Sequence, residues 1–467
     1  MKSRMATAVR TLPHDRLQED VWRPLRETST RYVVAVVLVG AVTLWGLFCW
    51  GYQIYNGIGV VGKNRPSMWA LYILNFVFWI GISHAGTLIS AILRLTHAGW
   101  RKPVTRAAEA ITVFCLMIGG LFPIIHLGRP WIFYYLIPYP NQRVLWPNFR
   151  SPLVWDLTAI LTYLTGSVLF LFLPMIPDLA QLSLHTTGWR RFLYRKLSLG
   201  WTGSDREWHS LERAMKLMAG LILAVAVSVH TVVAWDFAMA IAPLWHSTIF
   251  GPYFVVGAIF SGIAALLLVM AVIRKFMNLE AYLEPRHFEN LSRLLFLMSL
   301  LWLYFTVSEN LTAWYGNQPH EMQVFGTRVR GQYAPWFWLM VTCNFIIPFP
   351  ILSIKKLRTI PLIFFASCCI LVGMWIERFL IIVPTLVHPY LPYNYGHYWP
   401  SLTEATIASG TLGLFVLLYF LFAKFSPMIS IWEFEEGLQV AAHAGGEPHV
   451  PAVIGKTAIA AGPEGQR

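Results

Sequence analysis

Ionisable side chains recur inside the long apolar stretches of this sequence, where each costs about 2.5–3.5 kcal/mol at the centre of a membrane-spanning helix. Most of those that stand out lie toward one membrane face, and only His84 lies near the middle. They are His84, His126, Asp156, His230, Asp236, Glu309, Glu377, Arg378 and Glu404. Groups that merely meet water would lie at both ends, so this bias predicts one polar site near one face. In the opposite half of the membrane, His84 is the only side chain that we expect to take up and release a proton along a path.

His126, Asp156 and Asp236 have side chains that suit the oxidation of a quinol. Such a molecule releases two electrons and two protons, so its hydroxyl groups need carboxylates or imidazoles as acceptors, and its ring needs an apolar slot. Trp155 and Trp235 directly precede the two aspartates and could line that slot. The same residue types could equally bind a cation, so the side chains alone leave both uses open.

The elements that must position these residues are membrane helices. Of the 467 residues, 56% are hydrophobic and 13% are charged, which is about half the charged fraction of a soluble domain. This composition excludes an ordinary soluble enzyme. The net charge of +13 does not indicate a nucleic-acid partner, because the positive residues lie in short loops between the apolar runs.

Ten apolar runs reach the roughly 20 residues that a membrane-crossing helix needs. They cover 32–53, 67–93, 107–128, 152–174, 214–236, 250–273, 293–315, 334–354, 359–384 and 402–423. Lys and Arg number 28 in the segments on one side and 7 in those on the other. The positive-inside rule therefore predicts a multi-pass protein with both termini in the cytoplasm. We expect a tail at 1–31, a membrane domain at 32–424 and a second tail at 425–467.

A faint repeat relates the two halves of the membrane domain. Spans three and seven both end in a polar, aromatic turn, and spans four and eight both begin with Pro and Trp. We therefore expect an all-α fold of two four-helix bundles, at about 67–236 and 250–384. Spans one and ten would flank the bundles.

Metal-binding patterns are missing from the sequence. The five cysteines lie inside apolar runs, with no C-x-x-C pair and no Cys/His spacing typical of a metal site. A dihaem protein needs paired His on facing helices, and His97, the partner that His84 would need, falls in a loop. We expect no haem, iron–sulfur cluster or other metal on this chain. The outer loops are rich in Tyr, Trp and Pro, and they either sit in the membrane interface or dock a protein partner.

Several sequence strings resemble those of a known family. His126-Leu127-Gly128-Arg129-Pro130 and Pro177-Asp178-Leu179-Ala180 resemble motifs of the NrfD/polysulfide-reductase family of membrane subunits. Within that family, residues 229–237 and 308–316 look most like the quinol-binding membrane subunit of bacterial alternative complex III. The resemblance extends over about 30–435.

This resemblance implies a quinol:electron-acceptor oxidoreductase complex in the inner membrane of a bacterium, with menaquinol as the expected quinol. The subunit would oxidise quinol near the outer face and pass electrons to an iron–sulfur protein docked there. A second NrfD-like membrane subunit and multihaem cytochrome c subunits would complete the complex.

The family's quinol site falls on three residues of this sequence, and neighbouring groups extend it. The residues that we expect to bind quinol are His126, Asp156, Asp236, Trp155, Trp235 and Arg378, the first three of them catalytic. The residues that we expect on a proton path are His84, His230, Glu309 and Glu377. Whether Glu309, Glu377 and Arg378 serve the pocket or the path stays open.

Two further expectations concern protons and a rival function. Quinol oxidised near the outer face can release its protons outward, and any inward path would run through His84 and the hydroxyls of Ser83, Thr87 and Ser90 on the same helix. A secondary transporter also has repeats and buried charges, but its site usually lies at the membrane midplane. The bias toward one face favours quinol oxidation over transport.

Overall fold

The computed structural model describes residues 14–63, 67–142, 144, 148–391, 393 and 395–433, and within these ranges it contains helices and no strands. Ten helical segments are long and apolar enough to cross a membrane. They are α2 (Thr30–Asn56), α3 (Ala70–Leu95), α4 (Thr105–His126), α5 (Pro152–Phe172), α8 (Asp205–Ala238), α9 (Phe250–Phe276), α10 (Pro285–Gly316), α12–α13 (Ala334–Ser353), α14 (Ile360–Val387) and α15 (Leu402–Phe425). The predicted all-α fold with ten spans is confirmed.

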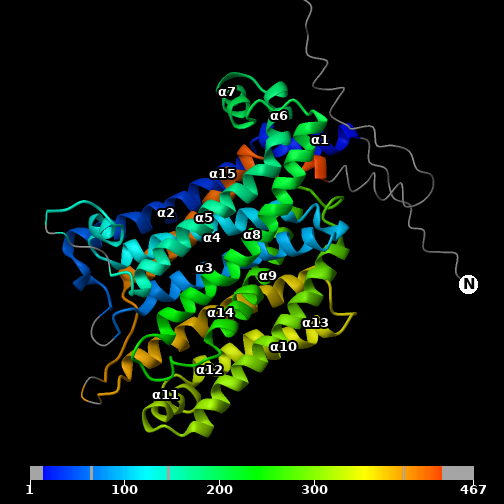
Figure 1. Cartoon of the computed structure of the whole chain (residues 1–467). Coiled ribbons are helices and arrows are strands. Elements are labelled where there is room, and N and C mark those ends of the chain that lie inside the picture. The colour runs from blue at the N-terminus through cyan, green and yellow to red at the C-terminus, as the bar shows by residue number, and fades with distance from the viewer. Residues whose placement is uncertain are drawn as a thin grey trace, which may run out of the picture.

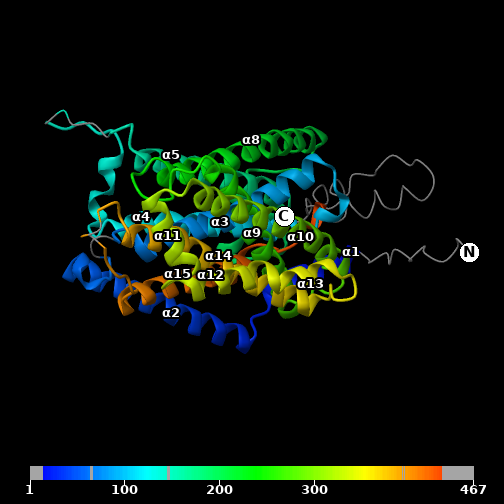
Figure 2. The ribbon, with the colours of Figure 1, turned by 90° about the horizontal axis from the view of Figure 1, so that it is seen from below.

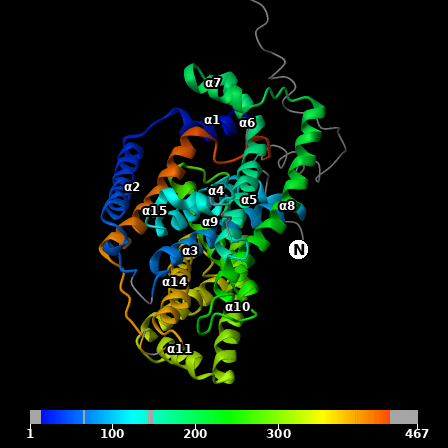
Figure 3. The same cartoon turned by 60° about the vertical axis from the view of Figure 1, so that its left-hand side comes forward.

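The spans pack as two four-helix bundles with two flanking helices (Figures 1 and 2). In the first bundle α3, α4, α5 and α8 form a closed ring of contacts, and in the second α9, α10, α12–α13 and α14 do the same. The two bundles meet where α3 packs on α9 and α14, and where α8 packs on α9. Helix α2 packs mainly on α15 at the edge of the molecule (Figure 3).

Close helix contacts depend on small residues at a few positions. A Cβ atom at Gly86 of α3 would lie 1.9 Å from the carbonyl oxygen of Ala108 on α4, a distance that no side chain tolerates. A Cβ atom at Gly46 of α2 would lie 2.6 Å from the Cα atom of Gly410 on α15. Glycine is therefore required where α3 meets α4 and where α2 meets α15.

Helix ends follow from capping residues in the sequence. Ser204 with Glu207 begins α8, and Ser401 with Glu404 begins α15, each as a reciprocal capping box. Because of its cap, α8 begins nine residues before the expected span at 214–236. The eighth span is not a continuous α-helix: a π-helical turn at Thr342–Ile346 joins α12 (Ala334–Val341) to α13 (Pro348–Ser353).

Short elements cover both ends of the bundles. One end carries α1 (His14–Arg26), η2 (Gly99–Arg101), η4 (Leu173–Met175), α6 (Ile176–His185) and α7 (Gly188–Leu197), and the other carries η1 (Ile58–Val60), η3 (Pro130–Leu136) and α11 (Pro319–Val329). Within the predicted N-terminal tail, α1 buries Val21, Trp22 and Leu25. Of the predicted C-terminal tail, residues 425–433 are described and Glu433 is buried; residues 1–13 and 434–467 lie outside the described part.

Candidate functional site

Two of the three residues predicted to be catalytic, Asp156 and Asp236, meet between α5 and α8. Asp156 lies in the second turn of α5 and Asp236 in the last turn of α8, and both are buried, with 6% and 8% of their surfaces exposed. The two carboxyl groups lie close enough together to interact. Two carboxylates that adjoin each other away from water repel each other when both are charged, so sharing one proton between them is favourable.

One oxygen of each aspartate is buried without a hydrogen-bond donor among the described residues. These atoms are Oδ1 of Asp156 and Oδ1 of Asp236. A buried acceptor without a partner carries the full cost of its lost hydration. The pair is therefore suited to accept hydrogen bonds from the hydroxyl group of a bound molecule.

Two tryptophans lie beside the aspartate pair. Trp155 and Trp235 precede the two aspartates on their helices, and their rings meet edge to face with centroids 6.4 Å apart. The Nε1 atom of Trp155 donates to the carbonyl oxygen of Phe149 at 2.8 Å, which fixes its ring. Trp235 is 42% exposed on the bundle surface. The two tryptophans therefore pair across the same α5–α8 contact as the two aspartates.

His126, the third predicted catalytic residue, is held by a lysine that was not among the predicted site residues. The Lys63 ammonium lies 2.7 Å from Nδ1 of His126 and donates to the His126 carbonyl oxygen at 3.0 Å. An ammonium can only donate, so Nδ1 of His126 accepts and its Nε2 atom carries the ring proton. The described contacts of His126 are with Lys63 and include no contact with either aspartate.

Lys63 is itself positioned by α2, α3 and α15. Its ammonium lies 5.1 Å from the centre of the Tyr72 ring, and the hydroxyl of Tyr72 donates to Gln53 at 2.5 Å. Gln53 in turn donates to the carbonyl oxygen next to His126. Burial lowers the pKa of Lys63 to about 8, while the negative charge of Glu404 acts in the opposite direction.

A second polar cluster lies in the second bundle. Oε1 of Glu377 accepts hydrogen bonds from Tyr253 at 2.6 Å and from Trp302 at 2.5 Å, and its Oε2 lies 3.5 Å from Arg378. The Arg378 guanidinium also lies 4.6 Å from the centre of the Phe254 ring. Arg378 thus contacts Glu377 and the α9 aromatics, and none of its described contacts is with the aspartate pair beside which it was expected.

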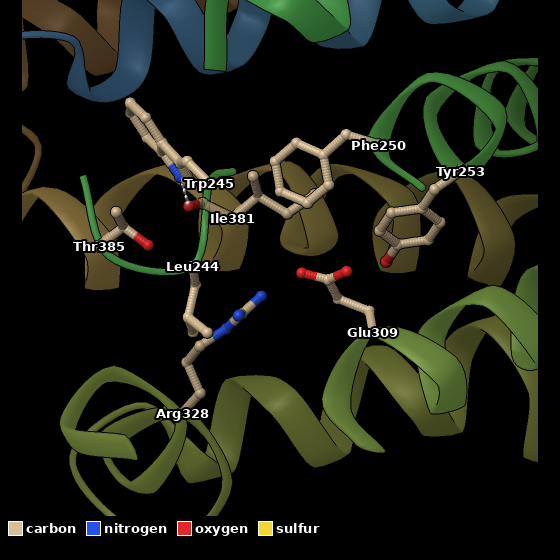
Figure 4. A pocket seen from close by; sticks show the side chains of 8 residues that line it. All are labelled: Leu244, Trp245, Phe250, Tyr253, Glu309, Arg328, Ile381 and Thr385. Atoms are coloured by element: carbon tan, nitrogen blue, oxygen red, sulfur yellow. Dashed lines mark hydrogen bonds between the residues drawn. The ribbon is translucent and has the colours of Figure 1, made fainter. Parts of the chain in front are cut away.

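Glu309 and Arg328 lie at the outer edge of this second cluster, at a small cavity (Figure 4). Glu309 accepts a hydrogen bond from Ser247 at 2.7 Å, and its carboxylate faces the Arg328 guanidinium of α11. Burial lowers the pKa of Arg328, and the charges of Glu309 and Glu377 act in the opposite direction. The cavity has a volume of about 10 Å³, close to the smallest space that holds one water molecule.

The comparison with known families decides the assignment of the chain. Residues 59–389 match the model of the polysulphide reductase NrfD family. This chain belongs to the NrfD family. Together with its ten apolar helices, that membership makes it a multi-pass membrane protein.

Three relatives cover most of this NrfD-family chain. A putative dimethyl sulfoxide reductase membrane subunit of Halobacterium salinarum is 27% identical over 71% of the chain and 72% of its own length. A selenate reductase subunit of Mesobacillus selenatarsenatis is 24% identical over 85% of the chain and 92% of its own length. An Hdr-like menaquinol oxidoreductase integral membrane subunit of Archaeoglobus fulgidus is 24% identical over 86% of the chain and 94% of its own length.

Two histidines of the NrfD-family chain meet where the bundles join. The rings of His84 on α3 and His230 on α8 lie 4.5 Å apart, and both residues are buried. Nδ1 of His84 donates to the carbonyl oxygen of Ile80 at 2.5 Å, which leaves Nε2 as the acceptor. Nε2 of His84 and both ring nitrogens of His230 have no hydrogen-bond partner within the described residues.

The prediction that His84 is the only titratable step in the inner half is wrong. Glu109 of α4 is 2% exposed and accepts a hydrogen bond from Ser90 of α3 at 2.6 Å. Thr87 donates to Thr112 at 3.0 Å one turn further on. Glu109 stands near the start of an expected span, where the sequence signal is a lone carboxylate in the run Thr105-Arg106-Ala107-Ala108-Glu109.

Asp178, in the second family motif, has a structural role at the basic end of the bundle. Its Oδ2 atom lies 2.6 Å from Arg106, and both side chains are buried. Arg106 also donates to the carbonyl oxygens of Pro427 and Pro174. This ion pair joins α4, α6 and the segment after α15.

No group of three or more His, Cys, Asp or Glu side chains that could hold a metal ion occurs in the described ranges. The five cysteines are unpaired thiols.

Proposed function

We propose that this NrfD-family chain is the quinol-binding membrane subunit of a quinol oxidoreductase complex of the alternative complex III kind. The observation that carries the proposal is the buried aspartate pair. Its carboxyl groups adjoin each other, its Oδ1 atoms have no hydrogen-bond partner among the described residues, and the same two helices bring two tryptophan rings together. The menaquinol oxidoreductase subunit among its relatives supports menaquinol as the substrate.

In this proposal the aspartate pair is the proton acceptor. A quinol hydroxyl donates to a free Oδ1 atom of Asp156 or Asp236, and the pair takes up its proton because one carboxylate is still ionised. Oxidation releases two protons and two electrons, so a second proton leaves after the first has been passed on. The site lies near the end of the bundle where α5 begins and α8 ends, which the predicted topology places at the outer face.

In this proposal His126 positions the substrate, whereas the sequence pattern predicts a catalytic role for it. While the Lys63 ammonium donates to Nδ1, the Nε2 atom carries hydrogen and acts as a donor. Such a donor holds a quinone oxygen in place and leaves proton uptake to the aspartates. Trp155 and Trp235 would contact the quinone ring on the side of the site that faces the membrane.

The two electrons must leave through another protein. We infer that they pass to an iron–sulfur subunit docked on the outer loops and then to multihaem cytochrome c subunits, with a second NrfD-like subunit in the same complex. The membrane subunits named among the relatives belong to dimethyl sulfoxide reductase, selenate reductase and menaquinol oxidoreductase systems, which supports the expectation of partner subunits.

Separate variants of the two aspartates test the site. In the purified complex, Asp156→Asn or Asp236→Asn should lower the rate of menaquinol oxidation at least tenfold, because an amide cannot accept the proton. Asp205→Asn, at the exposed start of α8, is the matched control and should keep the wild-type rate. Wild-type turnover in both site variants, with the complex assembled, would refute the proposal.

A proton path through the bundles is the second part of the proposed function. Side-chain hydrogen bonds join Ser90 to Glu109 and Thr87 to Thr112, and Thr112 donates to the carbonyl oxygen of Ser83 at 2.7 Å. These contacts lead along α3 to His84. From there His230 leads to the cluster of Glu377 and Glu309 in the second bundle, with buried water closing the gaps.

The path is tested by separating oxidation from translocation. His84→Ala and Glu109→Gln should each leave quinol oxidation within about twofold of wild type. Both should abolish proton translocation beyond the protons released by quinol itself, measured with a pH dye in proteoliposomes. Loss of quinol oxidation in His84→Ala would place His84 in the oxidation site or the core, and full translocation in both variants would exclude the path.

A further inference from the structure

A groove on the side of the molecule opposite the aspartate pair lies between α2, α9 and α15. Its volume is about 1050 Å³, and it is lined by the ends of α9 and α15, the start of α2 and the end of α1. Helix α2 packs on α15, which lies between it and the rest of the molecule (Figure 3), and it has few contacts with α9. The groove is bordered by the start of α2 and the ends of α9 and α15.

The walls of the groove are apolar, and they run along the membrane-spanning helices. Ala35 of α2, Leu268 and Val272 of α9, and Phe415 and Val416 of α15 line it. Helix α2 also exposes a run of large apolar side chains to the outside. Hydrocarbon chains aligned with the helices fit such walls.

The mouth of the groove is strongly basic. Arg23, Arg31, Lys275 and Lys424 line it together with a single acidic residue, Glu27. Lys424 donates to the carbonyl oxygens of Pro24 and Glu27, so its donors are used inside the protein. Arg31 and Lys275 are exposed, and within the described residues no carboxylate forms an ion pair with either.

We propose that this groove binds a phospholipid with an anionic headgroup. The phosphate and headgroup would contact Arg31 and Lys275 at the mouth, and the acyl chains would fill the space between α2 and α9. Basic pockets between membrane helices on the cytoplasmic side suit such headgroups, and the topology predicted from the sequence places this mouth in the cytoplasmic leaflet. The bound lipid would tie the peripheral helix α2 to the second bundle.

The charge of the mouth favours a lipid over the chain's own ends. Residues 1–13 carry three cations and no acidic group, so the basic mouth repels them. Residues 434–467 carry four acidic and two basic groups. They are the competing occupant that the experiment must exclude.

The test uses the purified complex in nanodiscs that contain a photoactivatable phosphatidylglycerol. We expect cross-links to peptides within 268–276 and 415–424, which unlabelled phosphatidylglycerol removes and phosphatidylcholine does not. The double variant Arg31→Gln with Lys275→Gln should lower this labelling at least fivefold. The double variant Lys355→Gln with Lys356→Gln removes two exposed lysines from another loop and is the matched control.

A second variant tests the apolar part of the groove while the charge at its mouth stays unchanged. Ala35→Trp fills the apolar part and leaves the basic mouth intact, so it should also lower labelling at least fivefold while the complex assembles. Unchanged labelling in both groove variants, or equal competition by phosphatidylcholine, would overturn the proposal. Labelling that appears only after residues 434–467 are removed would show that the tail occupies the groove, which also overturns it.

Discussion

Replacing Lys63 by methionine tests how the imidazole of His126 is held. The variant keeps an unbranched side chain but loses the ammonium that donates to Nδ1 at 2.7 Å and to the carbonyl oxygen at 3.0 Å. A hydrogen bond to a charged group contributes roughly 1.5–3 kcal/mol. Since 1.36 kcal/mol corresponds to a tenfold change in rate, Lys63→Met should lower kcat/KM for quinol about ten- to a hundredfold.

The pH dependence distinguishes a positioning role from a loss of packing. With its pKa lowered to about 8, Lys63 carries its charge below that pH and loses it above. Wild-type activity should therefore fall as the pH rises through about 8, and the Lys63→Met variant should lack this fall. Lys63→Arg keeps a cation at all working pH values, so its remaining activity should persist to higher pH.

The assay is menaquinol-analogue oxidation by the purified complex between pH 6 and 9.5, with kcat and KM measured separately. Lys355→Met, at an exposed loop position, is the matched control and should behave as wild type. If Lys63→Met stays within twofold of wild type and shows the same pH profile, Lys63 does not position His126.

Two further variants test the packing of the first bundle. Gly86→Ala should destabilise the protein by about 1–3 kcal/mol or more, because its Cβ atom would overlap the Ala108 carbonyl. The thermal midpoint of the complex should fall accordingly. Gly99→Ala is the control and should leave the midpoint unchanged, because the space around Gly99 is open. Arg106→Leu should destabilise by about 3–5 kcal/mol because Asp178 is left buried without its partner. The double variant Arg106→Leu with Asp178→Leu should recover part of that loss, and a midpoint no higher than that of the single variant would contradict this account.

Part of the candidate site could be predicted from the sequence because the signals act within single segments. A polar residue in an apolar run is conspicuous wherever the run is found, which is why Asp156, Asp236, His84 and His230 stood out. The hydroxyls of Ser90 and Thr87 stood out as a stripe on α3 for the same reason. Their partners Glu109 and Thr112 did not: Glu109 stands at the start of its apolar run, next to the charged segment that holds Arg106, and its pairing with Ser90 depends on how α3 and α4 are rotated against each other.

By itself the sequence determined the number of spans, because span length and hydropathy are properties of each segment, and a faint repeat between its halves predicted the grouping into two four-helix bundles. Only the tertiary structure decided which side chains meet. Lys63 lies in a loop 63 residues before His126, and its contact with Nδ1 exists because α2, α3, α4 and α15 converge at that end. Arg378 was assigned to the quinol site from its type and depth, yet it contacts Glu377 and Phe254. Depth along a helix follows from sequence position, but the direction in which a side chain points follows from packing against other helices.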